Sequence, residues 1–172
     1  LEAGDHVYIT GAYPDLRNFL KLTGQETKSV SSATIVGGGR ITYYLLNMLK
    51  QTKINTKVIE VNEERCEALS YAFPHTMVIH ADGTDHDVLE EQRITDYDAF
   101  VSMTGIDEEN LILSAYAKQQ GVQKIITKMS RPALLKVFKG FDNQSVVTPK
   151  RIVANEIIQF VRSRSNTQGS NV

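Results

Sequence analysis

The residues of this 172-residue chain that bear most directly on chemistry are three consecutive glycines and the arginine after them. With the next residue, the run reads Gly37, Gly38, Gly39, Arg40 and Ile41. It lies where a short apolar stretch gives way to a helical pattern, so its backbone can approach a pyrophosphate at a helix N-terminus. Gly37 and Gly39 fill two positions of a G-x-G-x-x-G fingerprint, whereas Thr42 occupies the third. The run therefore predicts phosphate binding, with a glycine turn that binds nothing as the alternative.

An acidic residue follows at the spacing expected for ribose recognition. Glu60 ends the next predicted strand, 23 positions after Gly37 by the numbering. A carboxylate there accepts hydrogen bonds from the ribose hydroxyls and repels a 2′-phosphate, which favours NAD or an adenosine nucleotide over NADP. The alternative is a solvated acid at a strand end.

Further candidate contacts follow the later predicted strands, at the edge where an open α/β sheet binds ligands. Asp82 is a candidate for the adenine amino group, or else forms an Asx turn. Thr104 and Gly105 suit contact with a dinucleotide, or else lead into a helix. Lys128 suits a phosphate or the distal ribose, or else is a surface lysine.

Neither a catalytic nor a metal-binding residue is predicted. The four histidines have no metal-ligand spacing, and Cys66 is expected in the core. A single cysteine excludes a disulfide framework and a thiolate-rich zinc site. The net charge of −1 gives no general attraction to nucleic acid, and no apolar run reaches the ~18 residues of a membrane helix.

Strand and helix patterns alternate along most of the chain, with short connections between them. Strands are expected to end at Val36 and to span 57–61, 76–80, 99–103, 124–129 and 145–147, with an earlier one over 6–10. Helices are expected after Pro14 and over 41–50, 62–73, 87–92, 107–120, 132–138 and 151–161. This alternation predicts an α/β fold, a Rossmann-like doubly wound parallel sheet.

Composition divides the chain into five segments. We expect the end of a preceding domain over 1–24, a linker over 25–31, the nucleotide-binding domain over 32–150, an interface helix over 151–162 and a polar tail over 163–172. The chain begins at Leu1 and shows no signal peptide, so we expect a cytoplasmic segment of a longer protein.

The order of these motifs and the residues in them resemble those of an RCK domain, also called a KTN domain. The resemblance rests on GGGRITYYL, KVIEVNEERCEAL, VIHADGTDHDVLEE, AFVSMTGIDEENLILSAYAKQQG and VVTPKRIVANEIIQFV. The opening LEAGDHVYITGAYPDLRNFLKLTG is similar to the strand–helix end of an α+β C-terminal RCK subdomain. That order resembles the second nucleotide-binding half of a tandem protein of the TrkA family.

The resemblance implies a regulatory module of potassium uptake rather than an enzyme. It implies that NAD(H), or ATP, ADP or AMP, binds at Gly37 to Ile41, Glu60, Asp82, Thr104, Gly105 and Lys128. It implies a membrane potassium transporter of Trk or Ktr type as partner, which would hold the module at the inner face of the plasma membrane. It also implies a homo-oligomer, a dimer by our expectation, formed through RCK faces and the helix over 151–162. Two rivals stay open: the cofactor half of an NAD-dependent oxidoreductase, and an assembly scaffold without ligand.

Overall fold

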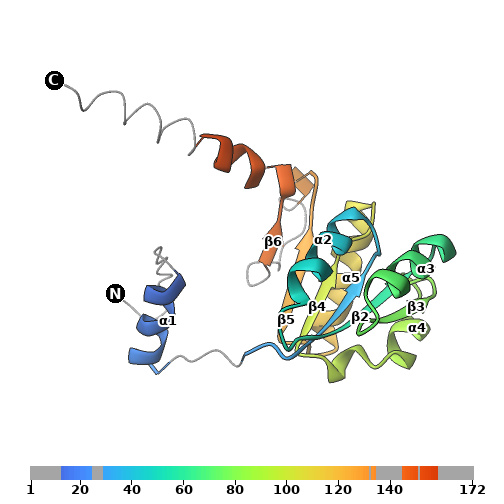
Figure 1. Ribbon diagram of the computed structural model, residues 1–172, viewed down its shortest axis with the longest axis horizontal. Coiled ribbons are helices and arrows are strands. Elements are labelled where there is room, and N and C mark those ends of the chain that lie inside the picture. Colours follow the sequence, from blue (N-terminus) through green and yellow to red (C-terminus); the bar gives the residue numbers. More distant parts are fainter. Residues whose placement is uncertain (1–12, 25–28, 132, 135–144, 151, 159–172) are drawn as a thin grey trace.

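A six-stranded parallel sheet forms the centre of the protein (Figure 1). The computed structural model describes residues 13–24, 29–131, 133–134, 145–150 and 152–158. The strands are β1 (Ser32–Val36), β2 (Asn55–Glu60), β3 (Met77–His80), β4 (Ala99–Ser102), β5 (Lys124–Lys128) and β6 (Ser145–Val147). Their order, β3-β2-β1-β4-β5-β6, reverses direction between β1 and β4, which is where doubly wound folds bind ligands. The predicted fold class is confirmed.

Each central strand supplies alternate apolar residues to two separate cores. One core contains Val36, Ile59, Phe100 and Ile125, together with residues of α4 and α5. The other contains their chain neighbours Ile35, Val58 and Val101, together with Leu46, Leu69 and Phe73 of the α2 and α3 region. Successive side chains of a strand point to opposite faces of the sheet. The two cores therefore fix the register of the strands and the face of the sheet on which each helix packs.

Four helices cover the sheet: α2 (Arg40–Leu49), α3 (Glu63–Ala72), α4 (His86–Glu91) and α5 (Asp107–Gln119). Asn62 caps α3 by accepting from the Arg65 N–H at 2.9 Å. A short 3₁₀ turn, Ile94–Asp96, connects α4 to β4. These short connections place every strand-to-helix turn at the same edge of the sheet.

The remaining elements lie outside the sheet layers. The helix α1 (Tyr13–Leu22) stands apart from the sheet in Figure 1, and Leu22 is exposed. Residues 152–158 are helical, and Ile152, Val153, Ile157 and Ile158 are exposed. The strand expected over 6–10 lies outside the described residues, as do most of the helix over 132–138, the whole tail over 163–172, and Arg151 and residues 159–161 of the last helix.

The second strand is shifted relative to the sequence expectation. It begins at Asn55, which pairs with Ser32, and it ends at Glu60, so Val61 is exposed rather than part of the strand. Lys57 lies inside this strand yet is buried. Its Nζ donates to the Gln92 carbonyl at 2.7 Å and lies over the Tyr97 ring, so the charge keeps a partner.

Candidate functional site

A cleft of about 630 Å³ opens at the carboxyl ends of β1, β2, β4 and β5. Nine of the ten predicted contact residues line it: Gly37, Gly38, Gly39, Arg40, Ile41, Glu60, Thr104, Gly105 and Lys128. Asp82 does not line it. The structure therefore brings together residues that span 92 positions of the sequence, because every parallel strand ends at this edge.

The glycine run forms a tight turn that touches both neighbouring strands. Gly37 has φ +102°, and a Cβ on it would lie 2.7 Å from the Met103 carbonyl oxygen. Its N–H donates to the Ile59 carbonyl at 2.9 Å. Gly39 differs, because an added Cβ there meets nothing within 4 Å and its φ of −74° suits any residue. Gly37 thus serves the turn, whereas Gly39 leaves space open in the cleft.

The N-terminus of α2 faces this space with no anion of its own. Gly39 is the N-cap residue, no side chain caps it, and the first turn holds no acidic residue. By contrast, α3, α4 and α5 each carry Asp or Glu in the first turn. The first N–H groups of a helix have no partner within the helix, and its dipole is positive there. Together with the Arg40 side chain, this end attracts an anion.

Thr42 stabilises the turn although it replaces the third glycine of the fingerprint. Its side chain is fully buried, and Oγ1 donates to the Gly37 carbonyl at 2.5 Å. The bond ties the first turn of α2 to the glycine run. Threonine in place of the third glycine therefore adds a hydrogen bond, and its side chain is accommodated inside the packed turn.

Glu60 lies almost buried beneath the glycine run, at 4% exposure. Its Oε2 accepts from the Gly38 N–H at 2.5 Å, and its Oε1 accepts from the Asn62 N–H at 2.8 Å. Arg65 approaches Oε1 at 3.7 Å with a largely exposed guanidinium. A carboxylate offers about four lone-pair positions, so two acceptor positions remain beyond the two backbone bonds.

Asn110 holds the opposite wall of the cleft in place. This buried side chain accepts from the Thr104 N–H at 2.8 Å and donates to the carbonyls of Thr104 and Lys128, each at 3.2 Å. Lys128 in turn donates from Nζ to the Thr104 carbonyl at 2.5 Å. The amine of Lys128 is thereby fixed at the cleft, beside the loop that follows β4.

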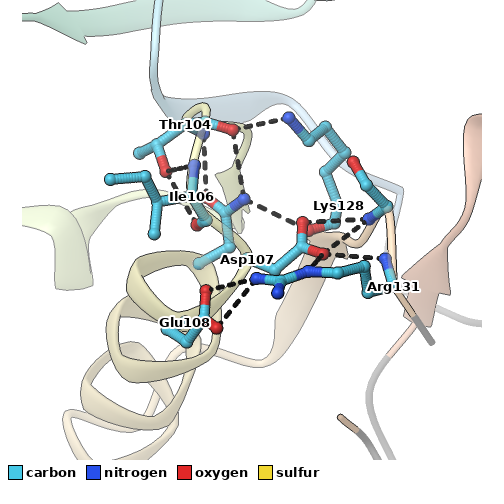
Figure 2. Close-up of polar contacts among 8 residues, drawn as sticks. Thr104, Ile106, Asp107, Glu108, Lys128 and Arg131 are labelled. Carbon is cyan, nitrogen blue, oxygen red and sulfur yellow. Dashed lines mark hydrogen bonds and ion pairs between the residues drawn. The ribbon is translucent and has the colours of Figure 1, made fainter. Parts of the chain in front are cut away.

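Asp107 anchors the end of β5 to the start of α5 (Figure 2). Its carboxylate accepts from the N–H groups of Ser130 and Arg131 at 2.8 to 3.0 Å. Burial alone would raise the pKa of Asp107, but these two bonds and the charges of Arg131 and Lys128 together lower it. Arg131 also binds both carboxylate oxygens of Glu108, at 2.8 and 2.9 Å. Asp107 is thus a structural anchor that joins the end of β5 to the first turn of α5.

Asp82 forms a local turn outside the cleft. Its Oδ1 accepts from the N–H and the hydroxyl of Thr84 at 2.9 and 2.7 Å, and these bonds lower its pKa. This is the Asx turn that the sequence left open as the alternative. A contact between Asp82 and adenine stays a prediction.

Besides Thr42, five cleft residues were not anticipated from the sequence: Tyr43, Arg65, Ala68, Leu69 and Met103. Arg65 and Leu69 face the cleft from α3, and Met103 faces it from the end of β4. The position of Arg65 in the first turn of α3, five residues after Glu60, could have indicated it. Leu69 and Met103 gave no signal, because apolar residues at helix and strand positions are typical of any core.

Cys66 and His80, two described side chains that could do chemistry, lie outside the cleft. Burial, with the charges of Glu60 and Glu63, raises the pKa of the Cys66 thiol, which disfavours the reactive thiolate. His80 contacts the Val61 carbonyl at 3.0 Å and does not line the cleft. Within the described ranges, no three acids, cysteines or histidines gather as a metal site. No helix there has the length and apolar character needed to span a bilayer.

Curated relatives are potassium uptake proteins. "Trk system potassium uptake protein trkA homolog 1" of Methanosarcina mazei is 27% identical over 165 residues, which cover 95% of this chain and 41% of the relative. "Trk system potassium uptake protein TrkA" of Halomonas elongata is 30% identical over 162 residues, which cover 94% of this chain and 35% of the relative. The chain therefore spans about two fifths or less of the relatives it matches.

Solved structures share the fold at low sequence identity. The TrkA-N domain of the inner membrane protein ybaL from Escherichia coli matches with a TM-score of 0.66 at 18% identity, covering 78% of this chain and 98% of that one. The NAD(P)-binding domain of an exopolyphosphatase-related protein from Archaeoglobus fulgidus matches with a TM-score of 0.65 at 16% identity, covering 78% and 99%.

The family assignment rests on a match that covers most of the sheet. The sequence pattern of the TrkA-N domain matches residues 33–149, from β1 to just beyond β6. The resemblance to an RCK domain is confirmed by this match, and the chain belongs to the TrkA-N domain family.

Proposed function

We propose that this chain is the nucleotide-binding regulatory module of a potassium uptake system. One observation carries the proposal: a helix N-terminus without cap or acid, the open position at Gly39, Glu60 and Lys128 all line one cleft. An anionic ligand with a ribose matches this set, because the helix end favours phosphate and the carboxylate accepts from hydroxyls. NAD(H) is the favoured ligand, with ATP, ADP or AMP as the other candidates.

Each group in the cleft has a defined task in this proposal. The free N–H groups of α2 and the Arg40 guanidinium bind phosphate oxygens, with Ile41 beside them. The unused acceptor positions of Glu60 receive the ribose hydroxyls. Lys128 meets a second phosphate or the distal ribose, and Thr104 and Gly105 lie against the ligand. In this proposal NAD(H) serves as a signal, as the names of the potassium uptake relatives support.

Regulation follows from a difference in affinity. A ligand shifts an arrangement of domains only as far as it binds one arrangement better than another. We propose that paired copies change their arrangement on binding and act on a membrane potassium transporter, which keeps the module at the inner face of the plasma membrane. The exposed apolar residues of the helix at 152–158 support pairing through that helix.

Calorimetric titration tests the binding step. We expect micromolar affinity for at least one of NADH, NAD, ATP and ADP, and a loss of about tenfold or more in Glu60→Ala. Glu67→Ala is the matched control, since Glu67 is an exposed glutamate of the neighbouring helix α3 that lies outside the cleft. Because Glu60 also holds Gly38, thermal melts must show that the variant is folded. A folded wild type that gives no heat with any of the four contradicts the proposal and favours the assembly scaffold.

Two further assays separate regulation from catalysis and test the coupling. NADH absorbance at about 340 nm should stay constant with a panel of carbonyl substrates, whereas its loss would favour the oxidoreductase. Potassium uptake by cells that express the full-length protein should change with Glu60→Ala and stay unchanged with Glu67→Ala. Equal uptake by both variants would contradict a regulatory role for the ligand.

A further inference from the structure

A second cleft, of about 540 Å³, lies at the opposite edge of the sheet from the nucleotide cleft. It opens between the C-terminal ends of α2 and α3, above the first residues of β2. Its size falls within the range of ligand pockets, about 300–1,000 Å³. No residue of the proposed nucleotide site lines it, so it is a separate feature.

The floor of this second cleft is apolar. Leu46 and Phe73 are nearly buried there, and Leu49, Ile54, Ala72 and Pro74 surround them. Polar groups are confined to the threonines, Asn55, His75 and two lysines. Such a combination, an apolar surface with a few convergent polar groups, is typical of sites for small organic molecules.

The charge of the second cleft has one sign. Lys50 and Lys53 line it, and its lining residues include no aspartate or glutamate. Neither lysine is ion-paired with any part of the chain that the structure describes. The Lys50 ammonium lies 4.7 Å from the centre of the Phe73 ring, which places the charge directly beside the apolar floor. Lys50 is the C-cap residue of α2, where a cation is favourable, whereas Lys53 lies three residues further along the chain and lines the same hollow.

We propose that the second cleft binds a small organic anion with an apolar or aromatic body, such as an aromatic or short-chain carboxylate or phosphate ester. The apolar body lies on Phe73 and Leu46, and the anionic group meets Lys50 and Lys53. This site is separate from the nucleotide cleft, so this proposal can be confirmed or refuted independently of the proposed function.

Two fluorescent probes that differ by one charge test the proposal. 8-Anilinonaphthalene-1-sulfonate carries the anion, and N-phenyl-1-naphthylamine has the same rings without it. We expect saturable binding of one sulfonate probe per chain, and binding of the neutral probe weaker by about tenfold or more. Lys50→Gln/Lys53→Gln should lower the affinity for the sulfonate probe by about tenfold and leave the affinity for the neutral probe unchanged within about twofold. The matched control is Lys21→Gln/Lys150→Gln, which removes the same charge elsewhere and should change neither.

Competition and NMR locate the probe. 4-Phenylbutyrate and phenyl phosphate should displace the probe. The ratio of their affinities shows whether the site prefers a carboxylate or a phosphate. NAD and ADP should not displace it, and amide shifts should centre on Thr56 and His75. The proposal is overturned by non-saturable binding, by equal affinity in the double variant, by shifts that centre on Gly38 and Gly105, or by displacement with nucleotide.

Discussion

Replacing Gly39 by serine separates ligand binding from stability. The backbone at Gly39 has φ −74° and ψ −172°, and it is the N-cap residue of α2. Serine is a preferred N-cap residue, and its Cβ would meet no atom within 4 Å. The folded state therefore accepts Gly39→Ser without strain, whereas the open space beside the helix N-terminus is filled.

The two effects have opposite signs. Better capping contributes a few tenths of a kcal/mol, and the loss of glycine freedom in the unfolded chain contributes about 0.4–1 kcal/mol. Together we expect a gain in unfolding free energy of about 0.6–1.4 kcal/mol, which raises the melting temperature by about 1–6 °C for a chain of this length. Nucleotide affinity should fall about tenfold or more, because the backbone can no longer approach a phosphate.

Differential scanning calorimetry and titration calorimetry on the same samples measure both quantities. Gly37→Ala is the contrasting variant, since its φ of +102° and the contact with the Met103 carbonyl predict a loss of about 2 kcal/mol or more. If Gly39→Ser binds nucleotide as tightly as the wild type, the phosphates do not lie on the glycine run. If it is strongly destabilised, our description of the turn is wrong.

Three further predictions concern the anchors of the cleft and its preference among nucleotides. Asp107→Asn should cost about 1–3 kcal/mol of unfolding free energy at neutral pH. Folding lowers the pKa of Asp107, so its ionised form stabilises the protein above about pH 4. The difference in unfolding free energy between wild type and variant should therefore close as the pH falls further. Urea unfolding across pH measures this, and a gap that persists at low pH contradicts it. Asn110→Ala should cost about 2–4 kcal/mol, since the Thr104 N–H and the Lys128 carbonyl lose their bond to Asn110 and the Thr104 carbonyl keeps only its bond from Lys128. The exposed Asn47→Ala should cost little. Equal urea midpoints for these two variants would exclude the anchoring role. NADP should bind about tenfold or more weakly than NAD, because Glu60 repels a 2′-phosphate. Equal affinities by calorimetry would mean that Arg65 cancels the negative charge of Glu60.

Most of the architecture follows from sequence patterns because the sheet is simple. Every strand is parallel, and all connections except the one from β3 to β4 join neighbouring strands, so alternating apolar segments determine the layers. The limits of β2 could not be predicted, since its first residues, Asn55 and Thr56, are polar. They belong to the strand because they pair with Ser32 and Ala33 of β1.

The candidate site was predictable where chemistry and spacing coincide, as at Gly37 to Ile41 and Glu60. It was less predictable where a side chain acts through the backbone of another residue. Asn110 and Asp107 read as ordinary positions of a helix, yet they anchor the loop after β4 and the end of β5. Their contacts join residues up to 24 positions apart, which no local pattern reports.

The turn after β1 also has a mechanical consequence. Gly37 donates to Ile59, Met103 donates to Val36, and Gly38 donates to Glu60, so one short turn is fastened to two neighbouring strands. A structure braced in this way is stiff, and a bound molecule deforms it little. We therefore expect any movement on ligand binding to occur in the segments that leave the sheet, α1 and the helix over 152–158, rather than in this turn.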